Sequence, residues 1–149
     1  MSEESAQNVV SSLANAIADL DADPHCSWWW DVESHKKGGL LDVVKTKIGL
    51  YLSPNQQGSG CVEGNKLRVE LGDKLVLNAN LLDFYLANPY LIPEDWRGKY
   101  TFFWGTIYRT ASGSLYVRYL YCDGRHWRWS YRILNHDWYF PNPAAVIEP

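Results

Sequence analysis

Two runs of alternating aromatic and polar residues, separated by Asp123-Gly124, constrain the fold of this chain more than any other feature. The first run covers Leu115–Cys122 and the second Arg125–Ile133. Alternation with a period of two is typical of a β-strand, and Asp-Gly between two such runs is a strong signal of a hairpin. With a third run at Tyr100–Arg109, which Ser112-Gly113 separates from the first, the sequence predicts a three-stranded antiparallel meander.

The register of this hairpin predicts which side chains share a face. If Asp123 and Gly124 form a two-residue type I′ loop, Cys122 faces Arg125 and Arg118 faces Trp129. A shift of one residue would oppose Arg118 and Arg128, which is unfavourable for like charges. We expect one face to be buried, with Arg118 against Trp129 in a cation–π contact, and its members are Tyr116, Arg118, Leu120, Trp127, Trp129 and Tyr131. We expect the other to face solvent, and it holds Val117, Tyr119, Tyr121, His126, Arg128, Ser130 and Arg132.

The rest of the chain indicates an α+β class in one domain over residues 1–149. Apolar residues at steps of three and four predict an amphipathic helix over residues 2–20, within an N-terminal segment 1–24. The mixed segment 25–98 contains a predicted strand at 40–52 and two short helices. Asn65 is the predicted cap of a helix ending near Leu71, and Asn78 or Asn80 that of a helix over 81–87. The meander takes 99–134, and the proline-containing tail 135–149 is predicted to be irregular.

Composition and charge narrow the function classes without naming one. The formal net charge of -3 disfavours a nucleic-acid-binding protein, although seven cations against one acid between Arg97 and Arg132 leave a locally basic sheet open. Three widely spaced cysteines are a poor disulfide framework and are typical of a reducing compartment. No signal peptide or membrane-spanning run is recognisable, so we expect a cytoplasmic protein without membrane contact.

Catalytic and metal-binding patterns are absent from the sequence. His25, Cys26, His35, Cys61, Cys122, His126 and His136 include both metal-ligand types, but they lack the local pairs of structural zinc sites. No nucleophile elbow, phosphate-binding loop or dinucleotide fingerprint occurs. We therefore expect no catalytic residue, no metal and no cofactor. A small metal- or His-dependent hydrolase or nuclease using His126, His136 and Asp137 stays as an alternative, and a subunit-interface protein as another.

Several ordered motifs carry a resemblance. These are Ile48–Pro54, Glu63–Arg68, Val76–Pro89, Leu91–Trp96, Phe103–Arg109 and Asn142–Val146. Together they resemble a family of short uncharacterised proteins from candidate-phyla bacteria, over about two-thirds of the chain. Members of that family differ mainly between the second hairpin strand and the Asn-Pro-Ala-Ala-Val end, and Ile133 stands where relatives carry Trp.

The resemblance implies a variable binding end. Its pattern is similar to that of proteins diversified by retroelements, which randomise adenines while copying a template. Matching positions are Arg128, Ser130, Arg132, His136, Tyr139 and Phe140. Trp codons contain no adenine, so the tryptophans of this region would form a fixed frame. The resemblance thus implies a non-enzymatic binder of an unidentified protein or small ligand, in which these six residues contact the ligand, and leaves the oligomeric state open.

Overall fold

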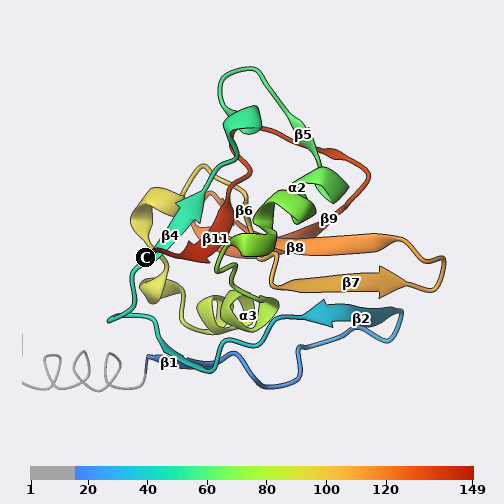
Figure 1. Cartoon of the computed structure of the whole chain (residues 1–149). Coiled ribbons are helices and arrows are strands. Elements are labelled where there is room, and N and C mark those ends of the chain that lie inside the picture. Colours follow the sequence, from blue (N-terminus) through green and yellow to red (C-terminus); the bar gives the residue numbers. More distant parts are fainter. Residues whose placement is uncertain (1–15) are drawn as a thin grey trace, which may run out of the picture.

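The computed structural model describes residues 16–149 (Figure 1). Most of the predicted N-terminal helix lies outside this range. Within it, the helix prediction is wrong, because Ile17–Asp19 form strand β1, which pairs antiparallel with β3 (Leu40–Asp42). Ala16, Ala18 and Leu20 are buried while the residues between them are exposed, a period of two that places one face of β1 against the core.

Seven strands of the described part form the main sheet, in the order β2-β7-β8-β6-β11-β4 with β9 paired to β8. Their bounds are β2 Trp30–His35, β4 Ile48–Tyr51, β6 Thr101–Phe102, β7 Thr106–Thr110, β8 Leu115–Asp123, β9 His126–Ile133 and β11 Ala144–Ile147. The pairing is antiparallel except between β6 and β11. The predicted meander is therefore present, with its first strand divided into β6 and β7. The predicted strand at 40–52 is likewise two strands, β3 and β4.

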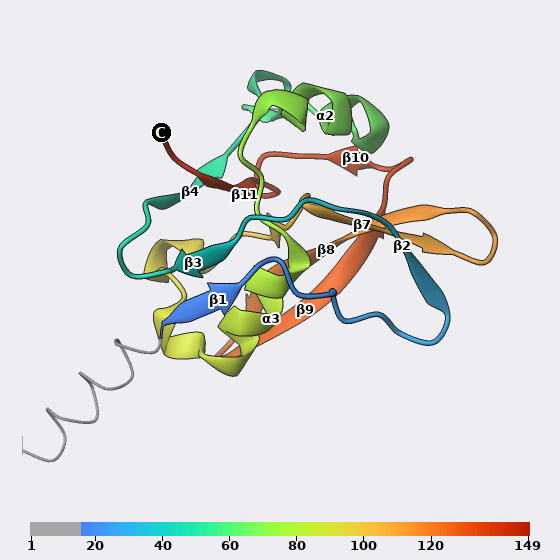
Figure 2. The ribbon, with the colours of Figure 1, turned by 60° about the horizontal axis from the view of Figure 1, so that its bottom comes forward.

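The two α-helices of the described range lie on opposite faces of this sheet (Figures 1 and 2). Helix α2 (Gly64–Glu70) begins at Glu63, whose carboxylate accepts a hydrogen bond from the backbone N–H of Asn65, so the prediction of Asn65 as the cap is wrong by two residues. Helix α3 (Ala79–Ala87) begins at Asn78, one of the two predicted caps. Single-turn 3₁₀ helices at Pro54–Gln56, Leu71–Asp73, Pro89–Leu91 and Glu94–Trp96 complete the helical structure.

Each face of the sheet has its own hydrophobic core. Leu81, Leu82 and Tyr85 of α3 pack with Leu120 in the first core. Leu67 of α2 packs in the second core, whose other members include Leu71, Phe102, Trp104, Ile107, Val117 and Trp138. A smaller cluster joins Trp30, Ala79 and Tyr108. Within residues 16–149, no helix is long and apolar enough to cross a membrane.

The hairpin register differs from the predicted one by two residues. Cys122 pairs with Trp127 and Asp123 with His126, so Gly124 and Arg125 form the loop. Gly124 has a positive φ of 63°, and no other residue type in the described range has a positive φ. A type II′ turn requires a positive φ only at its first central position, which Gly occupies without strain, whereas the predicted type I′ turn would also impose one on Asp123. Because the shift is even, every side chain keeps its predicted face.

The tail is not irregular, and it covers part of the face predicted to be exposed. Strand β10 (Asp137–Trp138) pairs with β5 (Val62–Glu63), and β11 pairs with β4 and β6 inside the main sheet. Ala144, Ala145 and Val146 are all buried, since both faces of the sheet are covered at this point. The prolines that suggested an irregular tail precede β11 or follow it, where they remove no ladder hydrogen bond.

Candidate functional site

Strand β9 brings three of the six predicted ligand-binding residues onto one face. Arg128, Ser130 and Arg132 alternate along the strand, so their side chains project from the same side of the sheet. Their partners across the hairpin are Tyr121, Tyr119 and Val117. This is the face on which the sequence placed them.

Exposure on this face decreases from the hairpin loop toward the tail. The side chain of Arg128 is 56% exposed, and its Nε lies 3.3 Å from Oδ2 of Asp123. Ser130 and Arg132 are half-buried, while Val117 at the far end is fully buried. The face is therefore open near the loop and closed where the tail packs on it.

Arg132 occupies the boundary between the open and closed parts. Its guanidinium carbon lies 5.0 Å from the ring centre of Phe102, 5.2 Å from that of Trp138 and 5.8 Å from that of Tyr119. Its Nη1 also donates a 2.8 Å hydrogen bond to Oδ1 of Asn142. Arg132 thus links β9 to the tail through contacts that an asparagine could not reproduce.

The surroundings of Arg132 also affect its ionisation. Burial lowers the pKa of the guanidinium, and the neighbouring phenols of Tyr119, Tyr139 and Tyr100 offset part of this decrease. The guanidinium stays charged at any physiological pH, because arginine is effectively always protonated in proteins. It therefore supplies a fixed positive charge among several tyrosines.

Tyr139 and Phe140 follow β10 in a loop whose main chain is held by hydrogen bonds. Asn142 Oδ1 accepts a 2.9 Å hydrogen bond from the N–H of Tyr139, and the carbonyl of Tyr139 accepts one of 2.8 Å from Nε2 of the buried Gln56. The two aromatic side chains are nevertheless 50% and 59% exposed. The main chain of this loop is therefore anchored, while about half of each aromatic residue stays exposed.

His136 is exposed in the turn between β9 and β10. Its N–H donates to the carbonyl of Ile133, and its own carbonyl accepts from the N–H of Gly64 at 3.0 Å. A Cβ atom at Gly64 would collide with the carbonyl oxygen of Leu134, so glycine is required for this close approach. The turn is held by its backbone, as the Tyr139 loop is.

Three tyrosines that the sequence did not single out as site residues lie beside these positions. Tyr100, Tyr119 and Tyr121 form a cluster with ring centres 5.7–6.0 Å apart. The alternation of β8 had placed Tyr119 and Tyr121 on this face, but no local signal placed Tyr100 there. We call these three tyrosines with Arg128, Ser130, Arg132 and Tyr139 the β9 surface, and His136 and Phe140 flank it in sequence at the tail end.

On the opposite face of the hairpin, α3 covers Arg118, Leu120 and Trp127, while Trp129 and Tyr131 stay partly exposed. Arg118, only 2% exposed in its side chain, donates two hydrogen bonds of 2.8 and 3.1 Å to the carboxylate of Asp83. Its guanidinium carbon lies 4.1 Å from the ring centre of Trp129, which confirms the predicted cation–π contact. Burial lowers the pKa of Arg118, but the hydrogen bonds and charge of Asp83 outweigh this effect and the pKa is raised.

The residues of the hydrolase alternative are not brought together. His126 begins β9 and His136 follows its end, so at 3.3 Å per residue they lie roughly 20 Å or more apart along the strand. Within residues 16–149, no three His, Cys, Asp or Glu side chains gather closely enough to hold a metal ion. The described cysteines are free thiols, and Cys122 accepts a hydrogen bond from Arg97 at 3.0 Å.

The chain matches no protein-family model, no curated protein and no solved structure.

Proposed function

We propose that this protein is a non-enzymatic binding protein that recognises another protein through the β9 surface and the flanking His136 and Phe140. The observation that carries the proposal is the contrast across the hairpin. Arg128, Ser130 and Arg132 project from one side of β9, exposed at Arg128 and half-buried at the other two. On the other side, Trp127 packs against the core under α3 and Tyr131 packs against Trp30. Such a strand presents side chains without depending on them for its own position.

The composition of the β9 surface supports a recognition role. Tyrosine supplies a large, rigid contact area at low entropic cost, serine adapts its hydrogen bonding, and arginine is enriched at energetically important interface positions. The four tyrosines, two arginines and one serine of the β9 surface match this pattern. A solvated structural face would more often carry lysine and glutamate, which interfaces disfavour.

The shape of the site favours a protein over a small molecule. The three principal cavities, of about 320, 420 and 250 Å³, are lined by none of the six predicted residues. Small-molecule sites are usually concave and enclose most of their ligand. An open, aromatic and cationic strand face suits a protein surface, including an acidic one.

The same geometry suits a surface that changes between copies of the gene, as the resemblance implies. Arg132 lies against Phe102 and Trp138 of the second core, whereas Tyr139 and Phe140 pack against none of the core clusters of residues 16–149. Substitution there would alter the surface and leave the frame of Trp127, Trp129 and Trp138 in place. Retroelement diversification of these codons is part of the proposal.

Sequencing this gene across a natural population of the source organism tests the proposal. Adenine-directed variation concentrated at the codons for residues 128, 130, 132, 136, 139 and 140 is the expected result, with the tryptophan codons constant. Uniformly low variation, or variation spread evenly over the exposed residues, would contradict it.

A subunit interface is a second candidate, because large aromatic side chains are exposed on the other face. Trp28 is 95% exposed, and Trp29, Trp129 and Tyr131 are each 37–40% exposed. In the part of the chain that the structure describes, β9 is also an edge strand that pairs only with β8, and open edges favour association. Sedimentation velocity tests it: concentration-dependent dimers that Trp28→Ser abolishes and Tyr90→Ser preserves would favour an interface, and a monomer at all concentrations would exclude it.

A further inference from the structure

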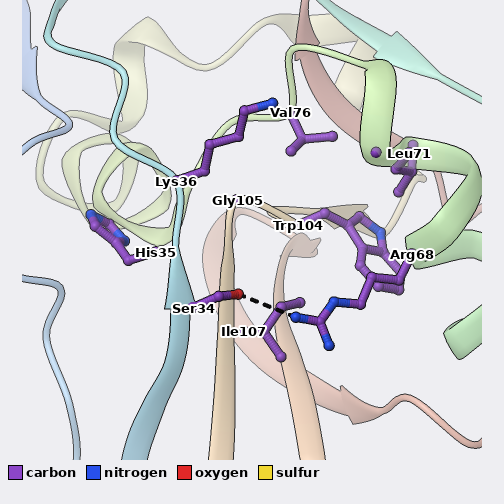
Figure 3. A pocket seen from close by; sticks show the side chains of 10 residues that line it. Ser34, His35, Lys36, Arg68, Leu71, Val76, Trp104, Gly105 and Ile107 are labelled. Atoms are coloured by element: carbon purple, nitrogen blue, oxygen red, sulfur yellow. Dashed lines mark hydrogen bonds between the residues drawn. The ribbon is translucent and has the colours of Figure 1, made fainter.

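A cavity of about 320 Å³ lies between α2 with its following 3₁₀ turn and strands β2 and β7 (Figure 3). Its lining includes Ser34, Lys36, Arg68, Leu71, Trp104 and Ile107. The volume is at the lower end of the range found for small-molecule sites. The cavity shares no residue with the β9 surface, so it is a separate candidate site.

Two cations at the cavity are without an ionic partner in the described range. The Arg68 guanidinium makes one long hydrogen bond, 3.4 Å from Nη2 to Ser34 Oγ, and the ammonium of Lys36 donates to the carbonyl of Lys74 at 2.9 Å. Across residues 16–149, no carboxylate lies within 4.0 Å of either side chain. None of the lining residues is acidic. The cavity therefore carries positive charge that the described residues do not neutralise.

The inner wall of the cavity is apolar and rigid. Trp104 is 5% exposed, and Leu71 and Ile107 are more deeply buried in the second core. Among residues 16–149, the indole N–H of Trp104 finds no hydrogen-bond partner. A buried donor without a partner is costly and is uncommon in native proteins. Figure 3 shows Arg68 reaching past Trp104 toward Ser34, and Lys36 reaching from the opposite side toward Val76.

We propose that this cavity binds a small organic anion: an oxyanion group held by Arg68 and attracted by the charge of Lys36, attached to a flat apolar body that lies against Trp104. A guanidinium forms paired hydrogen bonds to a carboxylate or phosphate, and a lysine ammonium adds a point charge. The apolar wall would exclude water from the body of the ligand. The ligand needs both parts, because an inorganic anion would make no contact with the apolar wall and a neutral aromatic would leave the two cations without a counter-charge.

Titration of the full chain with four probes tests the ligand class. Benzoate and phenyl phosphate carry both features, benzyl alcohol lacks the charge, and inorganic phosphate lacks the ring. We expect benzoate or phenyl phosphate to bind with a Kd of about 1 mM or lower, and the other two about tenfold or more weakly. The stronger of the two anions then distinguishes a carboxylate ligand from a phosphate ligand. Absence of saturable binding by both would overturn the proposal.

Matched double variants test the location. Lys36→Gln with Arg68→Gln removes the two lining cations, while Lys37→Gln with Lys66→Gln removes two exposed cations that lie one and two residues from them in sequence. Both variants have the same net charge. The first is expected to weaken binding of the anionic probe about tenfold or more, and the second less than about twofold. Equal losses in the two variants would show non-specific attraction and overturn the proposal.

A third variant separates a loss of binding from a loss of folding. Lys36 is exposed and its side chain contacts only a backbone carbonyl, so Lys36→Gln alone is expected to keep the thermal midpoint of the wild type. It should still weaken anion binding severalfold. Unchanged binding by this folded single variant would exclude Lys36 from the site and contradict the proposal.

Discussion

Each face of the β8–β9 hairpin carries an arginine that lies over aromatic rings, but the two arginines have different partners. On the α3 side, Arg118 is buried, lies over Trp129 and holds the carboxylate of Asp83 with two hydrogen bonds. On the other side, Arg132 also lies over aromatic rings, but its direct side-chain partner is the neutral amide of Asn142. A fully buried charge needs a counter-charge, whereas a charge at a half-exposed boundary is still partly solvated by water.

This contrast indicates which parts of the hairpin tolerate substitution. The α3 side depends on paired groups that must be kept together, because losing one leaves the other buried and alone. The β9 surface becomes progressively less dependent on its side chains from Arg132 toward Arg128. The predictions below test this gradient.

The largest effect is expected from Asp83→Asn on the closed face. The substitution leaves the Arg118 guanidinium buried without its counter-charge, and we expect the free energy of unfolding to fall by about 3 kcal/mol. The lower end of the usual range applies because the Asp83 side chain is 37% exposed. Urea denaturation measures the change. Glu33→Gln, which breaks the exposed pair with Arg109, is the control and should cost less than about 0.5 kcal/mol; similar losses in the two variants would contradict the account.

The closed face should also lose stability at alkaline pH. Burial raises the pKa of Tyr85 in the first core from its ordinary value of 10 to about 12. As pH rises, the unfolded chain therefore loses this proton before the folded chain does. The contribution of Tyr85 to the free energy of unfolding is fully present below pH 10 and falls by roughly 2 kcal/mol as pH rises from about 10 to 12. Urea midpoints measured across this range should decline less steeply in Tyr85→Phe, while an equally steep decline would assign the effect to other groups.

An intermediate effect is expected from Arg132→Ala at the boundary. Its contacts with three rings and its hydrogen bond to Asn142 are lost, at a cost of about 1–2 kcal/mol. Urea denaturation measures the loss, and Arg132→Lys should recover only part of it, because an ammonium lacks the planar fork. A wild-type urea midpoint for Arg132→Ala would mean that the boundary position tolerates substitution as well as the loop end does.

The smallest effect is expected at the open end. Arg128→Ala removes one exposed ion pair with Asp123, and we expect a change within about 0.5 kcal/mol. Raising the salt concentration should reduce even this difference, since exposed pairs are screened. A loss as large as that of Arg132→Ala would abolish the gradient.

Local patterns predicted this architecture better than long-range pairings. The alternation of Leu115–Cys122 and Arg125–Ile133 gave the strands and their faces, because side-chain direction depends only on parity. It could not give the register, which depends on whether Asp123 or Gly124 takes the first loop position. The sequence also missed β11, since Ala144–Val146 is a short apolar run next to prolines and its partners β4 and β6 are distant in the chain.

The candidate site shows the same limit. The faces of Arg128, Ser130 and Arg132 followed from alternation. The burial of Arg132 did not, because it depends on Trp138 folding back over the sheet. The cavity at Arg68 and Lys36 was also missed, as it joins segments 32 residues apart in sequence.

Replacing five recognition positions at once tests whether the surface can change while the frame stays folded. A chain carrying Asn at positions 128, 130, 136, 139 and 140 should fold cooperatively, with a free energy of unfolding within about 1–2 kcal/mol of the wild type, because exposed substitutions each cost little. Trp127→Asn with Trp129→Asn, on the α3 side, should cost considerably more. A quintuple variant that unfolds, or that is destabilised as much as the tryptophan pair, would contradict the division between a fixed frame and a changeable surface.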